Sequence, residues 1–336
     1  MLRKLLIPFL SLLVFINIYE LRTESSSAYQ MGAFSLPRVL FSSELTRDTS
    51  LSPTVQFLQK DRPLSPRTER YLRKGINFMH KFYITKFGYA FPKDFTVKIR
   101  VFRELKEYQN YTSRVASSPI TAHIGLYVHD LQEIVVWQGP DSLRFMKTVF
   151  HETNHLMLRS QSNFCPRWLN EGLSEYFEEL DVTGDVPVVN PQPRKELRLK
   201  ERLAKGEVPC LDAYMTQTNR QWSREDNASD APRMIAWSLV YYLMENEKGQ
   251  QVVKDMLHYF KNHQSVPDQM LQVVNTFSAM DSLSSAPFAS TTGPAFEQGW
   301  IKWIEQEKAP QILTTQALPA DYWADVRKWV ALKQWE

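Results

Sequence analysis

The amino-acid sequence predicts an α+β fold, with a small mixed β-sheet N-terminal to a mostly helical region. Short segments before residue 141 alternate apolar and polar residues, which is typical of strands, whereas the later segments follow helical spacing. The chain is 43% hydrophobic and 23% charged, as in average folded proteins, which excludes a disordered chain or a multi-span membrane protein. Its 336 residues are enough for about two domains.

The first 28 residues are interpreted as a signal peptide or an N-terminal anchor. Arg3 and Lys4 precede an apolar run over residues 5–18, which is short for a membrane-spanning helix of about 20 residues but typical of a signal sequence. Small residues at 26–28 offer a cleavage site, although they lie far beyond the apolar run. An uncleaved anchor at residues 1–19 and a buried N-terminal helix are the alternatives. With a signal or an anchor, the body of the protein is exported to the periplasm or the extracellular face.

Residues 29–67 are expected to form a Ser/Pro-rich tether, because repeated prolines block long helices. A helix is predicted from Ser65, with Pro66 in its first turn, to about Phe87. Period-two alternation predicts a strand over residues 95–102, and residues 123–128 and 133–137 are two further strand candidates.

After residue 141 the pattern predicts seven helices. The first two complete a lobe of residues 68–181 that also contains the sheet. The others form a helical lobe of residues 182–336 that closes a cleft. The predicted helices span residues 142–159, 168–180, 194–205, 232–247, 250–262, 295–307 and 321–333.

A His-Glu-x-x-His motif lies in the first of these helices, at residues 151–155. Residues four apart on a helix differ by about 40° around the axis and about 6 Å along it, so His151 and His155 share a face. Two imidazoles at this spacing can bind one zinc ion through nitrogens about 2.0–2.1 Å away. Glu152 lies one residue round, where it can take a proton from a metal-bound water and pass it to a leaving amine. A solvated helix face is the alternative, so a third ligand is needed.

Glu171 is the candidate third ligand, because it follows His155 by 16 residues in the next predicted helix. A short return would bring its carboxylate antiparallel to the first helix, and zinc accepts two histidines and one glutamate. Glu175, one turn on, falls on the same face and can accept the other N–H of a ligand histidine. The alternative is an exposed acidic pair in the first turns of a helix, which favour carboxylates in any case.

The motif at residues 151–155, followed by W-L-N-E-G-L-S-E-Y-F at residues 168–177, resembles the gluzincin zinc metallopeptidases, and it is most similar to the bacterial peptidase-MA-like family. The resemblance extends over about residues 78–303 and implies a thermolysin-like arrangement of the sheet and the zinc helices. It also implies zinc as the cofactor and a role for each matching residue. His151, His155 and Glu171 would be the ligands, Glu152 the catalytic base and Glu175 the carboxylate behind them.

The residue that stabilises the oxyanion departs from this family pattern. The family often shows a tyrosine four residues before the tryptophan that aligns with Trp237, and this chain has Arg233 there. Arg233 is a candidate cationic substitute, and a surface arginine is the alternative. Three tyrosines compete for the same role: Tyr176, Tyr241 and Tyr242.

The net charge and the cysteine content bear on the binding partners and on a possible disulfide. The formal net charge of +3 is too balanced for an electrostatic nucleic-acid binder, so no nucleic-acid partner is expected. The two cysteines, Cys165 and Cys210, either pair in an oxidising compartment or remain buried thiols.

Residues 133–137 are either a plain core strand or a sheet edge that an extended peptide joins.

The sequence therefore predicts an exported zinc metallopeptidase that acts on peptide or protein substrates, with a possible membrane tether through its N-terminal segment. Two alternatives stay open. One is a non-catalytic zinc-binding or scaffold protein on a gluzincin fold, and the other is an amidase that acts on cell-wall peptides.

Overall fold

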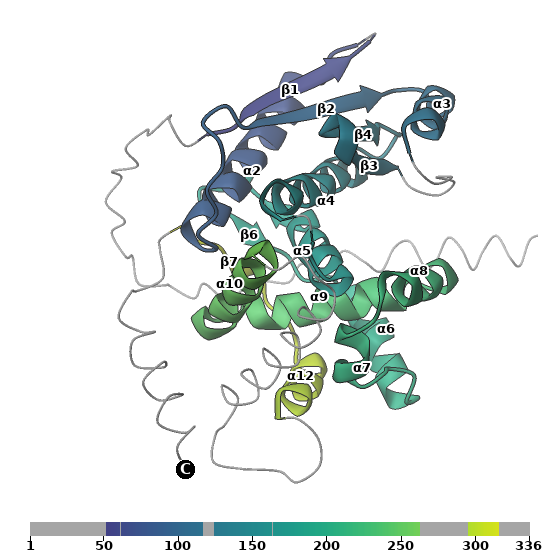
Figure 1. The fold of residues 1–336 in the computed structure, drawn as a ribbon, viewed down its shortest axis with the longest axis vertical. Coiled ribbons are helices and arrows are strands. Elements are labelled where there is room, and N and C mark those ends of the chain that lie inside the picture. The colour runs from purple at the N-terminus through teal and green to yellow at the C-terminus, as the bar shows by residue number, and fades with distance from the viewer. Residues whose placement is uncertain (1–51, 61, 117–123, 163, 263–294, 316–336) are drawn as a thin grey trace, which may run out of the picture. The chain divides into compact units, whose positions relative to one another are not determined.

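The computed structural model describes residues 52–60, 62–116, 124–162, 164–262 and 295–315 (Figure 1). The predicted signal peptide or anchor, the first part of the predicted tether and the helix predicted over residues 321–333 lie outside the described residues. Within the described part of the chain, no helix is both long and apolar enough to cross a membrane. The predicted α+β class is confirmed, because a small mixed sheet lies N-terminal to a helical region.

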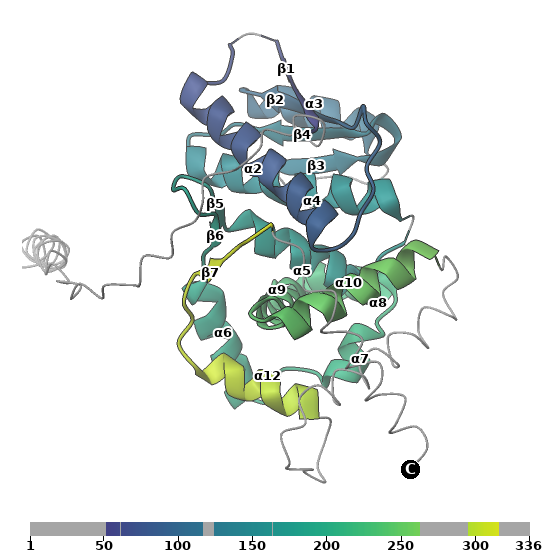
Figure 2. The same cartoon turned by 90° about the vertical axis from the view of Figure 1, so that its left-hand side faces the viewer.

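Four strands form the N-terminal sheet in the order β1-β2-β4-β3 (Figure 2). Strands β1, β2 and β4 are mutually parallel, and β3 runs antiparallel to β4. Three of the four strands were predicted from the sequence. Their bounds are β1 Thr54–Gln59, β2 Thr96–Phe102, β3 Gly125–Val128 and β4 Glu133–Trp137.

Strand β1 was not predicted, because it falls in the segment interpreted as a tether. Pro53 and Pro63 flank this strand, and prolines at this spacing predict a segment without regular structure. Val55 is nevertheless buried, and it pairs in parallel register with Val97 of β2. The partner strand is about 40 residues away along the chain, so the local composition carries little trace of this pairing.

Strand β4 is a core strand. It pairs with β2 on one side and β3 on the other, and residues 133–136 are all buried. The hypothesis that residues 133–137 form the edge for a peptide is therefore wrong. In the described part of the chain, β3 is the edge strand on this side of the sheet.

Helices α2 and α4 pack on one face of the sheet (Figure 2). Ser65 caps α2 by accepting a hydrogen bond from the backbone N–H of Thr68, and Pro66 occupies its first position. The opposite face packs against α3, because Tyr108 lies in an apolar cluster with Val128 and Val135. The bounds are α2 Pro66–Thr85, α3 Leu105–Val115 and α4 Ser142–Gln161.

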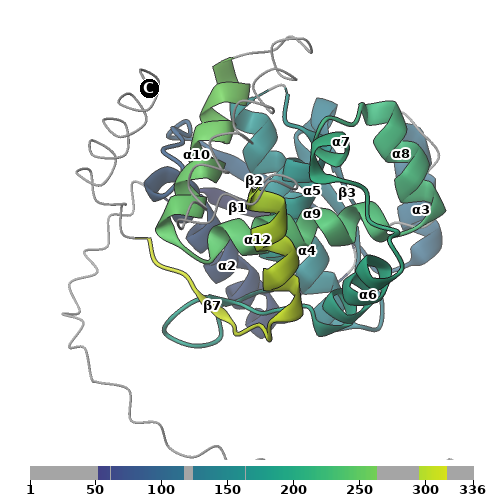
Figure 3. The same cartoon turned by 90° about the horizontal axis from the view of Figure 1, so that it is seen from below.

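Helix α9 is the centre of the helical region, and it packs against α5, α6, α8, α10 and α12 (Figure 3). Nearly all of its side chains are buried, as expected of a helix that is apolar all round. The bounds are α5 Arg167–Glu178, α6 Pro193–Ala204, α7 Leu211–Met215, α8 Asn219–Ala228, α9 Ala231–Met244, α10 Glu247–Asn262 and α12 Ala295–Glu305.

A second, three-stranded antiparallel sheet joins distant parts of the chain in the order β5-β6-β7. Its strands are β5 Leu180–Asp181, β6 Val188–Val189 and β7 Gln311–Ile312. The predicted lobe boundary after residue 181 falls inside this sheet. The predicted helices of the described residues are all present, with ends within three residues of those expected, whereas α3, α7, α8 and this sheet were not predicted.

Candidate metal centre

The helices that carry the candidate ligands, α4 and α5, run in opposite directions against each other. Their polar contacts follow reverse order along the two helices, because His151 contacts Glu178 whereas His155 contacts Asn170. Asp141 begins α4 by accepting a hydrogen bond from a first-turn backbone N–H at 3.0 Å. The return between the helices is short, as the antiparallel arrangement requires.

The structure brings the three predicted ligands together. The Nε2 atom of His151 lies 3.7 Å from Oε2 of Glu171, and Nε2 of His155 lies 3.9 Å from Oε1 of the same carboxylate. All three residues offer ligand atoms within 4.8 Å of one another. Neighbouring ligands in a tetrahedral zinc site are about 3.4 Å apart for ordinary bond lengths, so the two His–Glu separations exceed this spacing by a few tenths of an ångström.

Hydrogen bonds at the far nitrogens orient both imidazoles. His151 Nδ1 lies 3.1 Å from Oε2 of Glu178, and His155 Nδ1 lies 2.9 Å from Oδ1 of Asn170. Both oxygens are acceptors, so neutral imidazoles donate from Nδ1 and keep the lone pair on Nε2. When both rings are neutral, the two Nε2 lone pairs therefore face Glu171, and this is the tautomer that a metal ligand needs.

The carboxylate of Glu171 is buried and only partly satisfied. Arg167 donates to its Oε1 at 3.2 Å. Its Oε2 has no hydrogen-bond partner, although Nη1 of Arg233 lies 3.0 Å away at ion-pair distance. A buried oxygen without a hydrogen bond, beside two imidazole nitrogens, fits a cation ligand, because leaving such a group unpaired costs free energy. The donor set of two imidazoles and one carboxylate fits zinc.

Burial and charge act differently on these groups. Burial favours neutral His151, but the carboxylates of Glu171 and Glu178 outweigh it and raise the pKa of His151 well above its usual value. Burial prevails for His155, and its pKa is lowered. Burial also opposes the ionisation of Glu171, but His155, Arg233 and His151 outweigh it and hold the pKa of Glu171 well below its usual value. Glu171 is therefore an anion at neutral pH.

Glu152 lies beside Gly125, which is the first residue of the edge strand β3. A Cβ placed on Gly125 would lie 3.3 Å from Oε1 of Glu152 and 2.3 Å from Cγ2 of Thr148. The missing side chain therefore lets β3 approach this face of α4. Glu152 is 8% exposed, and within the described part of the chain it has no hydrogen-bond or ion-pair partner.

Gly172 sets how closely α9 approaches the centre. A Cβ on this residue would lie 2.5 Å from the carbonyl oxygen of Ala236 and 2.7 Å from Cγ2 of Val240. Helices α5 and α9 therefore pack with their backbones in near contact. This close packing places Arg233, in the first turn of α9, against Glu171.

Arg233 is therefore at the centre, but its guanidinium is engaged. Its Nε donates to Asp226 at 2.9 Å, while Nη1 faces Glu171. Two of the competing tyrosines donate elsewhere, Tyr176 to Gln311 and Tyr241 to the backbone carbonyl of Ala309.

Glu175 and Glu178 both offer a carboxylate oxygen within 4.8 Å of a ring nitrogen of His151, but Glu178, rather than Glu175, is at hydrogen-bond distance from this ligand histidine. Glu175 forms an ion pair with Lys195, and its other oxygen lies 3.9 Å from Arg233. Glu178 was not predicted from the sequence, although a spacing of seven residues also returns to the same helix face, about 20° from Glu171.

The cysteines do not form a disulfide. Cys165 is half-buried and Cys210 is exposed, and both are free thiols. Neither alternative of the sequence analysis therefore holds in full. Burial raises the pKa of the Cys165 thiol, which makes it unreactive.

The comparisons with known proteins add a family of unassigned function. No curated protein matches the chain. A family model described as a protein of unknown function, DUF1570, matches residues 146–268. The matched segment begins within α4 and includes all the candidate ligands and Arg233.

Proposed function

We propose that this protein is an exported, zinc-dependent metallopeptidase that hydrolyses peptide bonds. One observation carries the proposal. His151, His155 and Glu171 converge with their ligand atoms within 4.8 Å, and Glu152 follows the first histidine on the same helix. The resemblance of these residues to gluzincins supports the same reaction.

The ligand residues would hold the metal in a prearranged position. Bound zinc supplies a Lewis acid that polarises a carbonyl and lowers the pKa of a bound water to about 7. His151 and His155 present Nε2 because Glu178 and Asn170 fix their rings from behind. Glu171 contributes the negative charge that a divalent cation requires.

Glu152 is the proposed general base and acid. Its carboxylate has no partner among the described residues, so it is free to accept a proton from the attacking water. The same carboxylate then delivers that proton to the leaving amine. The burial of Glu152 keeps this transfer away from bulk solvent.

The edge strand β3 is the proposed support for an extended peptide. In the described part of the chain β3 pairs with β4 alone, so its other edge offers backbone groups for strand addition. Gly125 brings this edge to Glu152. A peptide on β3 would therefore carry a backbone carbonyl past the base.

Arg233 is proposed as a positioning residue. Its contacts with Asp226 and Glu171 leave it to hold the ligand carboxylate in place. This differs from the oxyanion role expected from the sequence.

The test combines metal analysis with the Glu152→Gln variant. The purified full chain is expected to hold one zinc per chain and to cleave an unfolded protein substrate. Glu152→Gln is expected to keep the zinc and lose at least about 100-fold in turnover. Glu201→Gln, at an exposed glutamate of α6, is the matched control and is expected to behave as the wild type.

Two results would contradict the proposal. If the purified chain holds no zinc, the proposed metal centre is wrong. A chain that binds zinc but leaves every peptide intact would indicate the non-catalytic zinc protein instead.

A further inference from the structure

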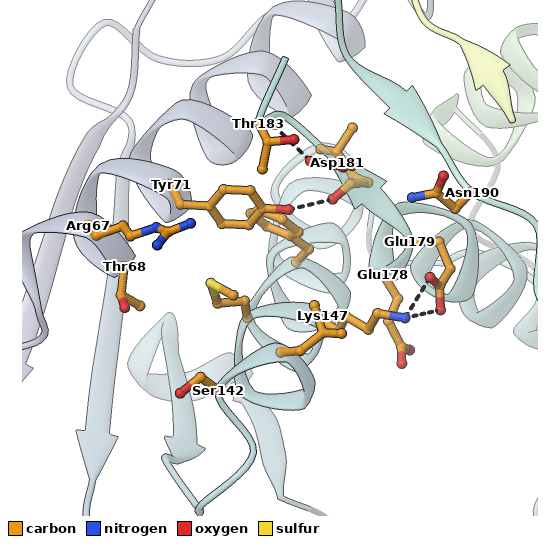
Figure 4. Close-up of a pocket in the computed structure, with 14 residues that line it drawn as sticks. Arg67, Thr68, Tyr71, Ser142, Lys147, Glu178, Glu179, Asp181, Thr183 and Asn190 are labelled. Carbon is orange, nitrogen blue, oxygen red and sulfur yellow. Dashed lines mark hydrogen bonds and ion pairs between the residues drawn. The ribbon is translucent and has the colours of Figure 1, made fainter. Parts of the chain in front are cut away.

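A cavity of about 550 Å³ lies between the first turns of α2 and α4 and the C-terminal end of α5 (Figure 4). It is separate from the face of α4 that carries Glu152, because its α4 lining comes from residues 142–150. Cavities of this volume hold small organic ligands. None of the roles proposed above uses it.

The two ends of the cavity carry opposite charge. Figure 4 shows the guanidinium of Arg67 on one side, near Thr68 and Ser142. Glu178, Glu179 and Asp181 lie on the other side. The first group lies in the first turns of α2 and α4, where the helix dipoles add positive potential.

The contacts of these groups leave a net charge at each end. Lys147 donates to both oxygens of Glu179 at 2.6 Å, so these two charges cancel. Asp181 accepts one backbone N–H, from Thr183, and keeps its negative charge. Glu178 already pairs with His151 at 3.1 Å, so Asp181 carries the net charge of the acidic end. Within the described part of the chain, Arg67 has no ion-pair partner.

Apolar side chains line the space between the two ends. Tyr71 and Phe150 lie with their ring centroids 5.7 Å apart, and Met146 lines the same wall. The hydroxyl of Tyr71 donates to the carbonyl of Leu180 at 3.1 Å. Burial and the charge of Asp181 raise the pKa of Tyr71 to about 12, so this hydroxyl stays protonated.

We propose that this cavity is a binding site for short apolar peptides with both termini free. The carboxylate of the peptide pairs with Arg67, its ammonium group pairs with Asp181, and its side chains cover the aromatic wall. A cation alone would leave Arg67 unpaired, and an anion alone would leave the acidic end unpaired. A zwitterion with an apolar body satisfies all three parts of the lining.

The site is distinct from the proposed peptidase centre but touches it through one residue. Glu178 lines the cavity and also orients His151. Peptide binding here does not require hydrolysis, so the proposal stands or falls independently of the proposed function.

The test measures binding by isothermal titration calorimetry, using the full chain with Glu152→Gln so that the ligand is not consumed. The probes are leucyl-leucine, its N-acetyl form and its C-terminal amide. Leucyl-leucine is expected to bind saturably, and blocking either end is expected to weaken binding about fivefold or more. Equal affinity for the free and blocked forms, or no binding of the free form, would overturn the proposal.

Variants assign each end of the ligand. Arg67→Gln is expected to bind the free dipeptide no better than the amide, and Asp181→Asn no better than the N-acetyl form. Arg70→Gln and Asp185→Asn change exposed charges near the same segments and serve as matched controls. If Arg67→Gln and Asp181→Asn both behave like these controls, the peptide binds elsewhere and the proposal is wrong. Circular dichroism checks that each variant is folded.

Discussion

The candidate metal centre and the dipeptide cavity use carboxylates from the same short stretch of chain, yet they suit different ligands. At the metal centre, Glu171 faces the Nε2 atoms of two imidazoles. In the cavity, Glu179 faces the ammonium group of Lys147. An imidazole lends a lone pair to a metal, whereas an ammonium group has none to give. The partner of each carboxylate, rather than the acidic residue itself, therefore decides what can bind.

Removing the metal should have the largest effect on the thermal stability of the protein. This effect should depend on the metal centre and not on the cavity. Zinc at about 1,000 times its Kd stabilises the fold by about 4 kcal/mol. We therefore expect a chelator to lower the Tm by roughly 8 °C in differential scanning calorimetry. Arg67→Gln is expected to show the same drop, because the cavity contributes no ligand. An unchanged Tm in the presence of chelator would mean that metal binding does not stabilise the fold.

Glu171→Ala should come next. We expect zinc affinity to fall by at least about 100-fold in a competition titration, because even residues behind the ligands change metal affinity by about 10- to 100-fold. Glu179→Gln, at the C-cap of the same helix, is expected to change zinc affinity by less than about twofold. Equal losses in the two variants would show that general acidity, not coordination, attracts the metal.

Gly172→Ala tests the helix contact that positions Arg233. Alanine favours a helix over glycine by about 1 kcal/mol, but its Cβ would meet the carbonyl of Ala236. We expect a net loss of about 1–2 kcal/mol in the free energy of unfolding, measured by urea denaturation. Gly184→Ala, where the nearest atom would lie 3.8 Å away, is the control and should stay within about 0.5 kcal/mol. A stabilised Gly172→Ala variant would contradict the packing argument.

Glu178→Gln should have the smallest effect on zinc. We expect about a 10-fold loss of zinc affinity, because glutamine still accepts from His151 but lacks the charge. Glu175→Gln is the control, since Glu175 pairs with Lys195 instead. A larger zinc loss in Glu175→Gln would restore the role that the sequence assigned to Glu175.

Local pattern accounts for much of the fold. Each described helix expected from apolar spacing is present, and three of the four strands of the first sheet were predicted, one of them from alternation. The signals that were missed are short or non-local. The parallel strand β1 is stabilised by pairing with β2, whose Val97 lies far along the chain. The strands of the second sheet have only two residues each.

The candidate centre divides in the same way. The spacing of four residues places His151 and His155 on one helix face whatever else the chain does, and Glu171 follows from a short return. The neighbours of these residues depend on how helices pack. Arg233 reaches Glu171 because Gly172 lets α9 approach, and no local pattern records that distance.

By itself, the sequence determined the α+β class, most of the helices and the three side chains that offer metal ligands, because helical periodicity fixes which residues share a face. Only the tertiary structure decided that Glu178 orients His151, that β3 rather than β4 is the edge, and that Arg67 faces Asp181 across an apolar cavity. These features depend on distances between elements that are remote in the chain. Such distances are set by side-chain packing, which periodicity does not encode.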